Sequence, residues 1–341
     1  MDIISPKERL LNVLSGKPAD RPTVICPGGM MNAAVVDVMK NGAHTLPAAH
    51  HDAGLMSGLA DDVQRETGFE NFGIPFCMTV EAESLGSSVD YGTIKCEPKI
   101  GKESFPSVRD VEFRPKRAIE KNKRARAIVD AISTLSQKYP DIPTIGAITG
   151  PLSTSASIVD PMTFLKELRR GKNDAHRVLD YVCNQLIDYA GLMIEGGADV
   201  ISIADPTATG EILGPLMFGE YAVPYLNQLA DAIHKLGIPV IIHICGNVKT
   251  VRKGLAMLHG DALSVDAMVS LGTLKSEISG LTTMGNLSTY MLEFGDEEKV
   301  RSGVRSLLGQ NIDIMAPACG LSTSTPIRNI RAFTLAVKEG L

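Results

Sequence analysis

The sequence has no tryptophan, and tyrosine and phenylalanine together make up only 5% of its 341 residues. It therefore has few aromatic side chains for stacking on nucleobases. Positive charge is not in excess either, because 34 Lys and Arg residues face 39 Asp and Glu residues, for a formal net charge of −5. Proteins that bind nucleic acid usually carry a basic face. We therefore expect no nucleic-acid partner.

The sequence also lacks an uninterrupted hydrophobic run of membrane-spanning length. The longest uncharged stretch near its centre, residues 142–159, contains two prolines and two glycines and is rich in serine and threonine. The N-terminus has charged residues where a signal peptide needs an apolar core. Only six cysteines occur, without a close pairing pattern, which suits a reducing compartment. These absences predict a cytoplasmic protein with no membrane partner.

What the sequence does contain is a rhythm of short apolar runs separated by helical stretches. Near-continuous apolar runs are typical of parallel strands covered on both faces. Eight such strands alternating with helices predict a (β/α)8 barrel of the TIM type with N-terminal helices, as a single domain over residues 1–341. The expected strands are residues 23–26, 71–76, 144–149, 200–204, 240–244, 262–265, 282–285 and 312–316.

Between these runs, apolar residues recur with helical spacing. Residues 82–115 break the rhythm with repeated glycine and proline, so we expect a small insertion of short strands there. The first helix has a clear start, with Ser5 as its cap and Pro6 in its first position. The further expected helices are residues 30–40, 53–67, 116–137, 175–195, 218–236, 248–259, 297–308 and 326–338.

Three potential metal ligands lie at the carboxyl ends of expected strands, where barrels of this kind carry their reactive side chains. His243 and Cys245 are two residues apart, so on a strand both face the same side. Cys319 follows the last strand, which a closed barrel places beside the first. Two cysteines and one histidine with an open fourth position form a known ligand set of catalytic zinc. Cysteine is also among the most buried residue types, so spacing alone leaves a metal-free core open.

Other polar residues near strand ends are candidates for substrate binding. Glu81 and Asp205 are carboxylates that would be costly to bury unpaired. Each could orient a substrate or a ligand, or simply pair with an arginine or a backbone amide. Asn286 could hydrogen-bond to substrate, or it could serve only in a turn.

Several segments resemble those of a known superfamily. Residues 241–248 (IIHICGNV) and 312–320 (IDIMAPACG) resemble the two zinc motifs of corrinoid-dependent methyltransferases in the uroporphyrinogen decarboxylase superfamily. Residues 75–83, 197–206 and 284–288 also fit, in the expected order. The resemblance covers most of the chain and is strongest to the methylcobamide:coenzyme M methyltransferases.

This resemblance implies a barrel with zinc held by His243, Cys245 and Cys319. Asp266 stands where the family places a carboxylate near the metal, usually a glutamate. It is expected to be a labile fourth ligand, or else to orient another ligand or cap a helix. The resemblance also implies a methylated corrinoid supplied by a partner corrinoid protein. A zinc-bound thiol, deprotonated by the metal, would take the methyl group and leave Co(I).

Alternatives remain at this point. Porphyrinogen decarboxylation is excluded, because residues 26–32 lack the arginines that the decarboxylases place after their first strand. A first-step methyltransferase, which passes a methyl group from a methoxylated compound or a methylamine to Co(I), remains open. So does a non-catalytic corrinoid- or zinc-binding protein. The sequence names neither the small methyl acceptor or donor (coenzyme M, homocysteine, a folate or a methoxylated compound) nor the oligomeric state.

Overall fold

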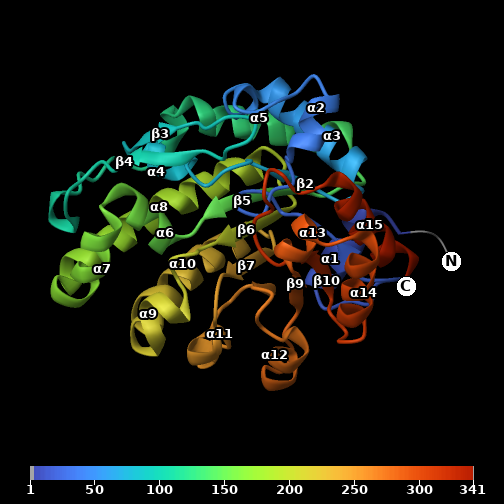
Figure 1. The fold of residues 1–341 in the computed structure, drawn as a ribbon. Helices are drawn as coiled ribbons and strands as arrows, with labels where there is room; N and C mark the ends of the chain where they lie inside the picture. Colours follow the sequence, from blue (N-terminus) through green and yellow to red (C-terminus); the bar gives the residue numbers. More distant parts are fainter. Residues whose placement is uncertain (1–3, 341) are drawn as a thin grey trace.

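Eight parallel strands form the centre of the computed structural model, which describes residues 4–340 (Figure 1). The described residues do not include residues 1–3 or residue 341. Residues 1–3 are part of the N-terminal segment for which the sequence predicts no signal peptide. The strands lie side by side in the order β1-β10-β9-β8-β7-β6-β5-β2. This confirms the predicted TIM-like α/β fold. The strands are β1 (Thr23–Val24), β2 (Phe72–Ile74), β5 (Thr144–Thr149), β6 (Val200–Ala204), β7 (Val240–Ile244), β8 (Ala262–Val265), β9 (Thr283–Leu287) and β10 (Ile314–Pro317).

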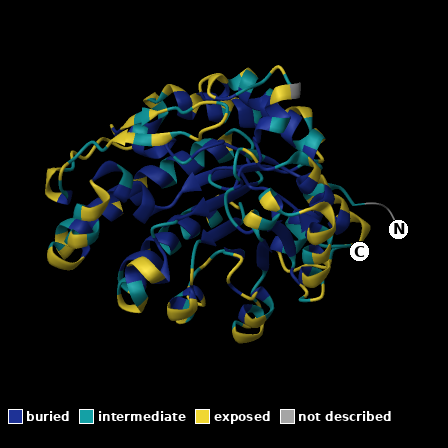
Figure 2. Cartoon of the chain, in the orientation of Figure 1, coloured by how far each residue is buried: buried dark blue, intermediate teal, exposed yellow. Residues whose placement is uncertain are grey.

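Helices surround these strands and turn their exposed faces outward (Figure 2). The first helix begins as the sequence predicts, since the Ser5 hydroxyl accepts a hydrogen bond from the Glu8 amide at 3.1 Å. The α-helices are α1 (Pro6–Leu14), α2 (Val36–Asn41), α3 (Ala53–Thr67), α4 (Val80–Ser84), α5 (Lys123–Lys138), α6 (Pro151–Ile158), α7 (Pro161–Arg170), α8 (Lys172–Glu195), α9 (Gly210–Met217), α10 (Val223–His234), α11 (Arg252–Leu255), α12 (Leu271–Glu277), α13 (Thr289–Phe294), α14 (Glu297–Leu308) and α15 (Ile327–Glu339). Short 3-10 or π turns are η1 (Ala48–His50), η2 (Val108–Asp110), η3 (Ala118–Lys121), η4 (Phe218–Ala222) and η5 (Lys249–Val251).

Two of the predicted helices are much shorter than expected. Residues 30–35 are not helical, because the chain turns at Gly28, whose φ of +93° favours glycine, and Gly28 and Met31 exchange backbone hydrogen bonds. The helix expected at residues 248–259 ends at Leu255. There the Asn227 side chain of α10 bonds both the Met257 carbonyl and the His259 amide, which holds this segment as a turn.

The insertion predicted at residues 82–115 contains two short antiparallel strands, β3 (Ser88–Asp90) and β4 (Lys99–Lys102). Its tip, residues 91–98, reaches the loop that follows β10, where the Thr323 hydroxyl donates to the Lys95 carbonyl at 2.9 Å. No helix within residues 4–340 is both long enough and apolar enough to cross a bilayer.

The core has two apolar clusters. One lies between the strands and the helices, and the other fills the interior of the sheet. It is formed by inward-facing strand residues such as Ile145, Ile241 and Met284. Leu10 and Leu14 of α1 belong to the same cluster, so this helix covers the amino ends of the strands. The side chains at the carboxyl ends of the strands therefore form the opposite face.

The seam between the two outermost strands is closed by side chains. Within the described residues no ladder pairs β1 with β2, in contrast to the fully closed sheet that was expected. The Glu70 amide donates to the Val24 carbonyl at 2.9 Å, and the Glu70 carboxylate accepts from the Val24 amide at 3.0 Å. The Asn71 side chain bonds both the amide and the carbonyl of Cys26, each at 2.9 Å. Two side chains thus take the place of backbone partners.

Glu70 is the buried centre of this seam. Its carboxylate pairs with Arg9, which is 3% exposed, and with Arg21. Burial alone would raise the pKa of Glu70, but the Arg21 hydrogen bond, the Val24 amide and the charge of Arg9 together lower it. The ionised carboxylate therefore stabilises the folded chain.

We expect Glu70→Gln to lower the free energy of unfolding by about 3 kcal/mol at pH 7, because it removes the buried charge that Arg9 and Arg21 share and leaves Arg9 with only the part-exposed carboxylate of Asp20. Since the pKa of Glu70 is lowered on folding, this difference should be complete above its ordinary value of 4.5 and should shrink as the pH falls below it. Urea unfolding measures both effects. Glu277→Gln, which breaks only the exposed pair with Arg252, is the control. An equal loss of unfolding free energy in Glu70→Gln and Glu277→Gln would contradict the role given to Glu70.

Candidate metal centre

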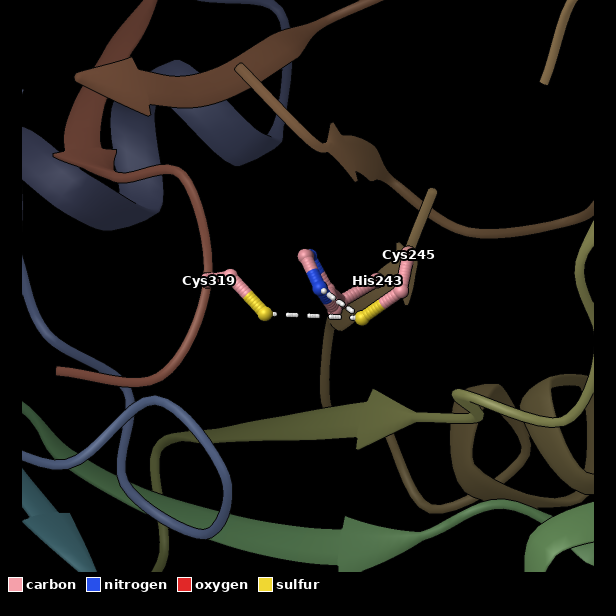
Figure 3. A group of neighbouring side chains, drawn as sticks. All are labelled: His243, Cys245 and Cys319. Atoms are coloured by element: carbon pink, nitrogen blue, oxygen red, sulfur yellow. Dashed lines mark hydrogen bonds between the residues drawn. The ribbon is translucent and has the colours of Figure 1, made fainter. Parts of the chain in front are cut away.

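The three predicted metal ligands come together at the carboxyl ends of β7 and β10. His243 lies in β7 and is fully buried, Cys245 follows directly after this strand, and Cys319 lies two residues beyond β10. Their ligand atoms all lie within 4.8 Å of one another. Figure 3 shows Cys319 approaching from one side and His243 and Cys245 from the other. Strands that are far apart in the sequence thus supply one site.

Local backbone geometry sets this approach. Gly246 turns the chain after Cys245 with a φ of +70°, a conformation that glycine adopts without strain. Gly320 lies so close to the Met30 carbonyl that a Cβ atom there would stand 2.7 Å from its oxygen. A glycine therefore follows each cysteine. Gly246 turns the chain, and Gly320 allows its loop to contact the loop that contains Met30.

The three ligand atoms form a hydrogen-bonded chain. His243 Nε2 lies 3.0 Å from Cys245 Sγ, which lies 3.6 Å from Cys319 Sγ. The hydrogen bond from Cys245 lowers the pKa of Cys319 to about 4, while the same bond and burial raise the pKa of Cys245. A metal ion bound to both sulfurs would displace the proton that links them.

Ser264 orients the histidine, and the sequence analysis missed it. Its buried hydroxyl lies 2.9 Å from His243 Nδ1, and the β7–β8 register places the two residues directly opposite each other. In the tautomer whose Nδ1–H donates to this hydroxyl, Nε2 is free to act as a ligand. The available signal was a serine inside the apolar run of residues 262–265.

Met30 is a second neighbour of the sulfur ligands. Its Sδ lies 3.9 Å from Cys245 Sγ. The position follows from the turn at Gly28, which replaces the first part, residues 30–35, of the helix expected at residues 30–40. The thioether gives the sulfur ligands an apolar neighbour.

Asp266 is not part of the group whose ligand atoms all lie within 4.8 Å. One of its carboxylate oxygens accepts from the Met268 amide at 3.2 Å, in the turn after β8. Asn286 donates its side-chain amide to the backbone oxygens of Asp266 and Val269, each at 2.8 Å. Asn286 therefore holds the loop that carries Asp266. Metal ligation by Asp266 and substrate binding by Asn286 stay predictions.

Glu81 and Asp205 are both buried and both bonded to neighbouring backbone. Glu81 accepts from the amide and hydroxyl of Thr149, and burial raises the pKa of Glu81. Asp205 accepts from the amides of Leu152 and Ser153, each at 2.9 Å, and from the Ser153 hydroxyl. Burial raises the pKa of Asp205 to about 6. Both carboxyls hold the β5–α6 connection, and their binding of substrate stays a prediction.

We expect Ser264→Ala to weaken metal binding by about 10- to 100-fold, because the histidine ring loses the partner that fixes its orientation. Competition for Zn²⁺ with a chromophoric chelator measures the affinity. Ser202→Ala is the matched control, because Ser202 is a buried serine of β6, on the other side of β7, and its side chain has no hydrogen-bond partner among residues 4–340. Equal affinities for both variants would contradict the role of Ser264.

We expect Asp205→Ala to cost more stability at pH 5 than at pH 8. The pKa of Asp205 is raised from 3.8 to about 6 in the folded chain, so the wild type gains stability by binding a proton as the pH falls through 6. The cost should be about 1 kcal/mol larger at pH 5, as measured by urea unfolding. The pKa of Asp160, an exposed cap of α7, is lowered, so the cost of Asp160→Ala should not differ between these two pH values. If Asp205→Ala lowers the free energy of unfolding by the same amount at pH 5 and pH 8, the raised pKa of Asp205 is contradicted.

Fold and site together define an α/β-barrel enzyme with a candidate metal centre at the carboxyl ends of its strands. A family model described as uroporphyrinogen decarboxylase (URO-D) matches residues 5–340. The methylcobamide:CoM methyltransferase MtbA of Methanosarcina mazei is 32% identical over 340 residues, 98% of each chain. The methylcobamide:CoM methyltransferase MtaA of Methanosarcina barkeri is 29% identical and covers 98% of this chain and 97% of that protein. A solved structure, a methyltransferase from Methanosarcina mazei, matches with a TM-score of 0.92 at 28% identity over 99% of both chains.

The chain belongs to the uroporphyrinogen decarboxylase family. The relatives named above, which it matches along almost its whole length, are methyltransferases, and the prediction of a methyltransferase is confirmed.

Proposed function

We propose that this protein is a zinc-dependent methyltransferase that moves a methyl group from a methylated corrinoid, carried by a partner protein, to a small thiol. The observation that carries the proposal is the convergence of His243, Cys245 and Cys319 at the carboxyl ends of the strands. The named activity of the relatives, methyl transfer between a methylcobamide and coenzyme M, supports the same reaction.

The donor set fits zinc in chemistry and spacing. Zinc is commonly bound by cysteine and histidine in tetrahedral sites, with Zn–S bonds of about 2.3 Å. Two sulfurs at tetrahedral angles would then lie about 3.8 Å apart, and Cys245 Sγ and Cys319 Sγ lie 3.6 Å apart. Three protein ligands leave a fourth position for a substrate or a labile ligand such as Asp266.

A zinc ion in this site would supply one element of chemistry, the deprotonation of a coordinated thiol at neutral pH. The protein's own groups would prepare the site for that thiol. Ser264 holds the His243 ring with Nε2 toward the sulfurs, and Met30 lies against Cys245. Because α1 covers the amino ends of the strands, both the thiol and the methylated corrinoid would approach from the carboxyl end.

Two further points belong to this proposal. All six cysteines are free thiols in the structure, which agrees with a reducing cytoplasm. We also propose that residues 1–341 act as one catalytic domain, since both zinc-ligating segments belong to the same sheet.

The decisive experiment is demethylation of free methylcob(III)alamin, followed by its visible spectrum, with zinc-loaded protein and a panel of thiols. We expect turnover with coenzyme M, and a loss of about 100-fold or more in Cys319→Ser, because a ligand of the metal is removed. A chelator should abolish turnover, and added Zn²⁺ should restore it. Cys183→Ala, which removes a buried thiol of α8, is the control.

Failure of every thiol would contradict the proposed direction of transfer. Methylation of Co(I) cobalamin by a methoxylated compound or a methylamine would then identify the first-step methyltransferase. Failure of both reactions, with zinc still bound, would indicate a non-catalytic zinc protein.

A further inference from the structure

Met30 brings a third sulfur atom to the candidate metal centre. Its Sδ lies 3.9 Å from Cys245 Sγ, and it lines the same cavity as Cys319. Two sulfurs bound to one tetrahedral zinc ion lie about 3.8 Å apart, for Zn–S bonds of about 2.3 Å. The spacing of Met30 and Cys245 therefore allows both sulfurs to bind the same ion, as does the 3.6 Å between Cys245 and Cys319.

The loop after β1 fixes the backbone of Met30. Gly28 and Met31 exchange backbone hydrogen bonds of 3.0 and 2.9 Å across this loop. The Gly29 amide donates at 2.6 Å to a carbonyl of the segment that follows β2. On the other side, Gly320 packs directly against the Met30 carbonyl. A ligand on a backbone held in this way loses less conformational freedom when it binds.

Two carboxylates on nearby loops are less well placed to bind the metal. Asp266 accepts a hydrogen bond from the Met268 amide in its own turn. Glu97 lines the same cavity as Met30, but it is exposed at the tip of the insertion. Neither carboxylate belongs to the group whose ligand atoms all lie within 4.8 Å of one another. The Met30 sulfur, in contrast, contacts a member of that group directly.

We propose that Met30 is the labile fourth ligand of the metal ion when no thiol is bound. The inference rests on the proposed function and names its labile ligand, for which Asp266 is the alternative. A thioether is a soft, uncharged ligand that suits zinc beside thiolates. An incoming thiolate can displace it, because the thiolate adds the attraction of a negative charge for the ion. In this exchange the bond from the metal to Met30 breaks, a bond to the thiol sulfur forms, and the thiol proton passes to solvent.

The test uses zinc-loaded protein in which selenomethionine replaces the 14 methionines, and it measures X-ray absorption at the zinc edge. Selenium scatters more strongly than sulfur, so a bound Met30 adds a Zn–Se shell slightly beyond the Zn–S shell at about 2.3 Å. We expect this shell in the wild type and its loss in Met30→Leu. Met31→Leu, which changes the adjacent, buried methionine inside the sheet, is the matched control and should keep the shell. Saturating coenzyme M should remove the shell from the wild type.

The outcomes separate this inference from the proposed function, because the selenium shell is measured without turnover. If the protein binds no zinc, the proposed function itself fails. If zinc binds but the wild type shows no Zn–Se shell, or Met30→Leu keeps it, the inference is overturned. Loss of a zinc ligand in Asp266→Ala, with no selenium shell in the wild type, would give the fourth position to Asp266. A shell that remains at a coenzyme M concentration that saturates turnover would overturn the labile role.

Discussion

The buried carboxylate of Glu70 is the interaction on which the geometry of this protein depends. It stands where backbone groups would normally join the first and second strands of a closed barrel, and it bonds the Val24 amide while pairing with two arginines. Strand β10, which precedes Cys319, lies directly beside β1. The seam therefore lies one strand away from the strand that leads to Cys319. A charged group can fill this position because its burial is offset by opposite charge and by hydrogen bonds.

In the candidate metal centre the fold, rather than the local sequence, brings the three side chains together. His243 and Cys245 share one strand end, and a third ligand arrives from a loop 74 positions further along. Neighbouring groups take up the secondary tasks: Ser264 orients the ring, Met30 lines the sulfurs, and Asn286 holds the adjacent loop. The contact of Ser264 with His243 crosses between neighbouring strands, so its geometry follows from the parallel register rather than from proximity in sequence.

The strand rhythm and the pair of His243 and Cys245 were predictable from short-range regularities, whereas Cys319 was added from its position after the last expected strand and from the family resemblance. Apolar runs mark buried parallel strands, and the two-residue spacing of His243 and Cys245 places both on one side. What escaped prediction depends on contacts between distant segments. The helix expected at residues 248–259 is cut short by Asn227 of α10, and the seam relies on side chains of Glu70 and Asn71. Ser264 carried only a weak signal, since its role exists only opposite His243 across the sheet.

The docking of the insertion tip onto the loop after β10 has a consequence for how proteins of this architecture can diverge. The Thr323–Lys95 contact joins two segments that are 228 positions apart in the chain. Residues 88–102 contribute no strand to the eight-stranded sheet and no member of the Cys2His group. Mutations in this hairpin can therefore accumulate without disturbing the barrel or its ligands. Such separation lets evolution change the sequence of the hairpin while the strands and the Cys2His group are inherited intact.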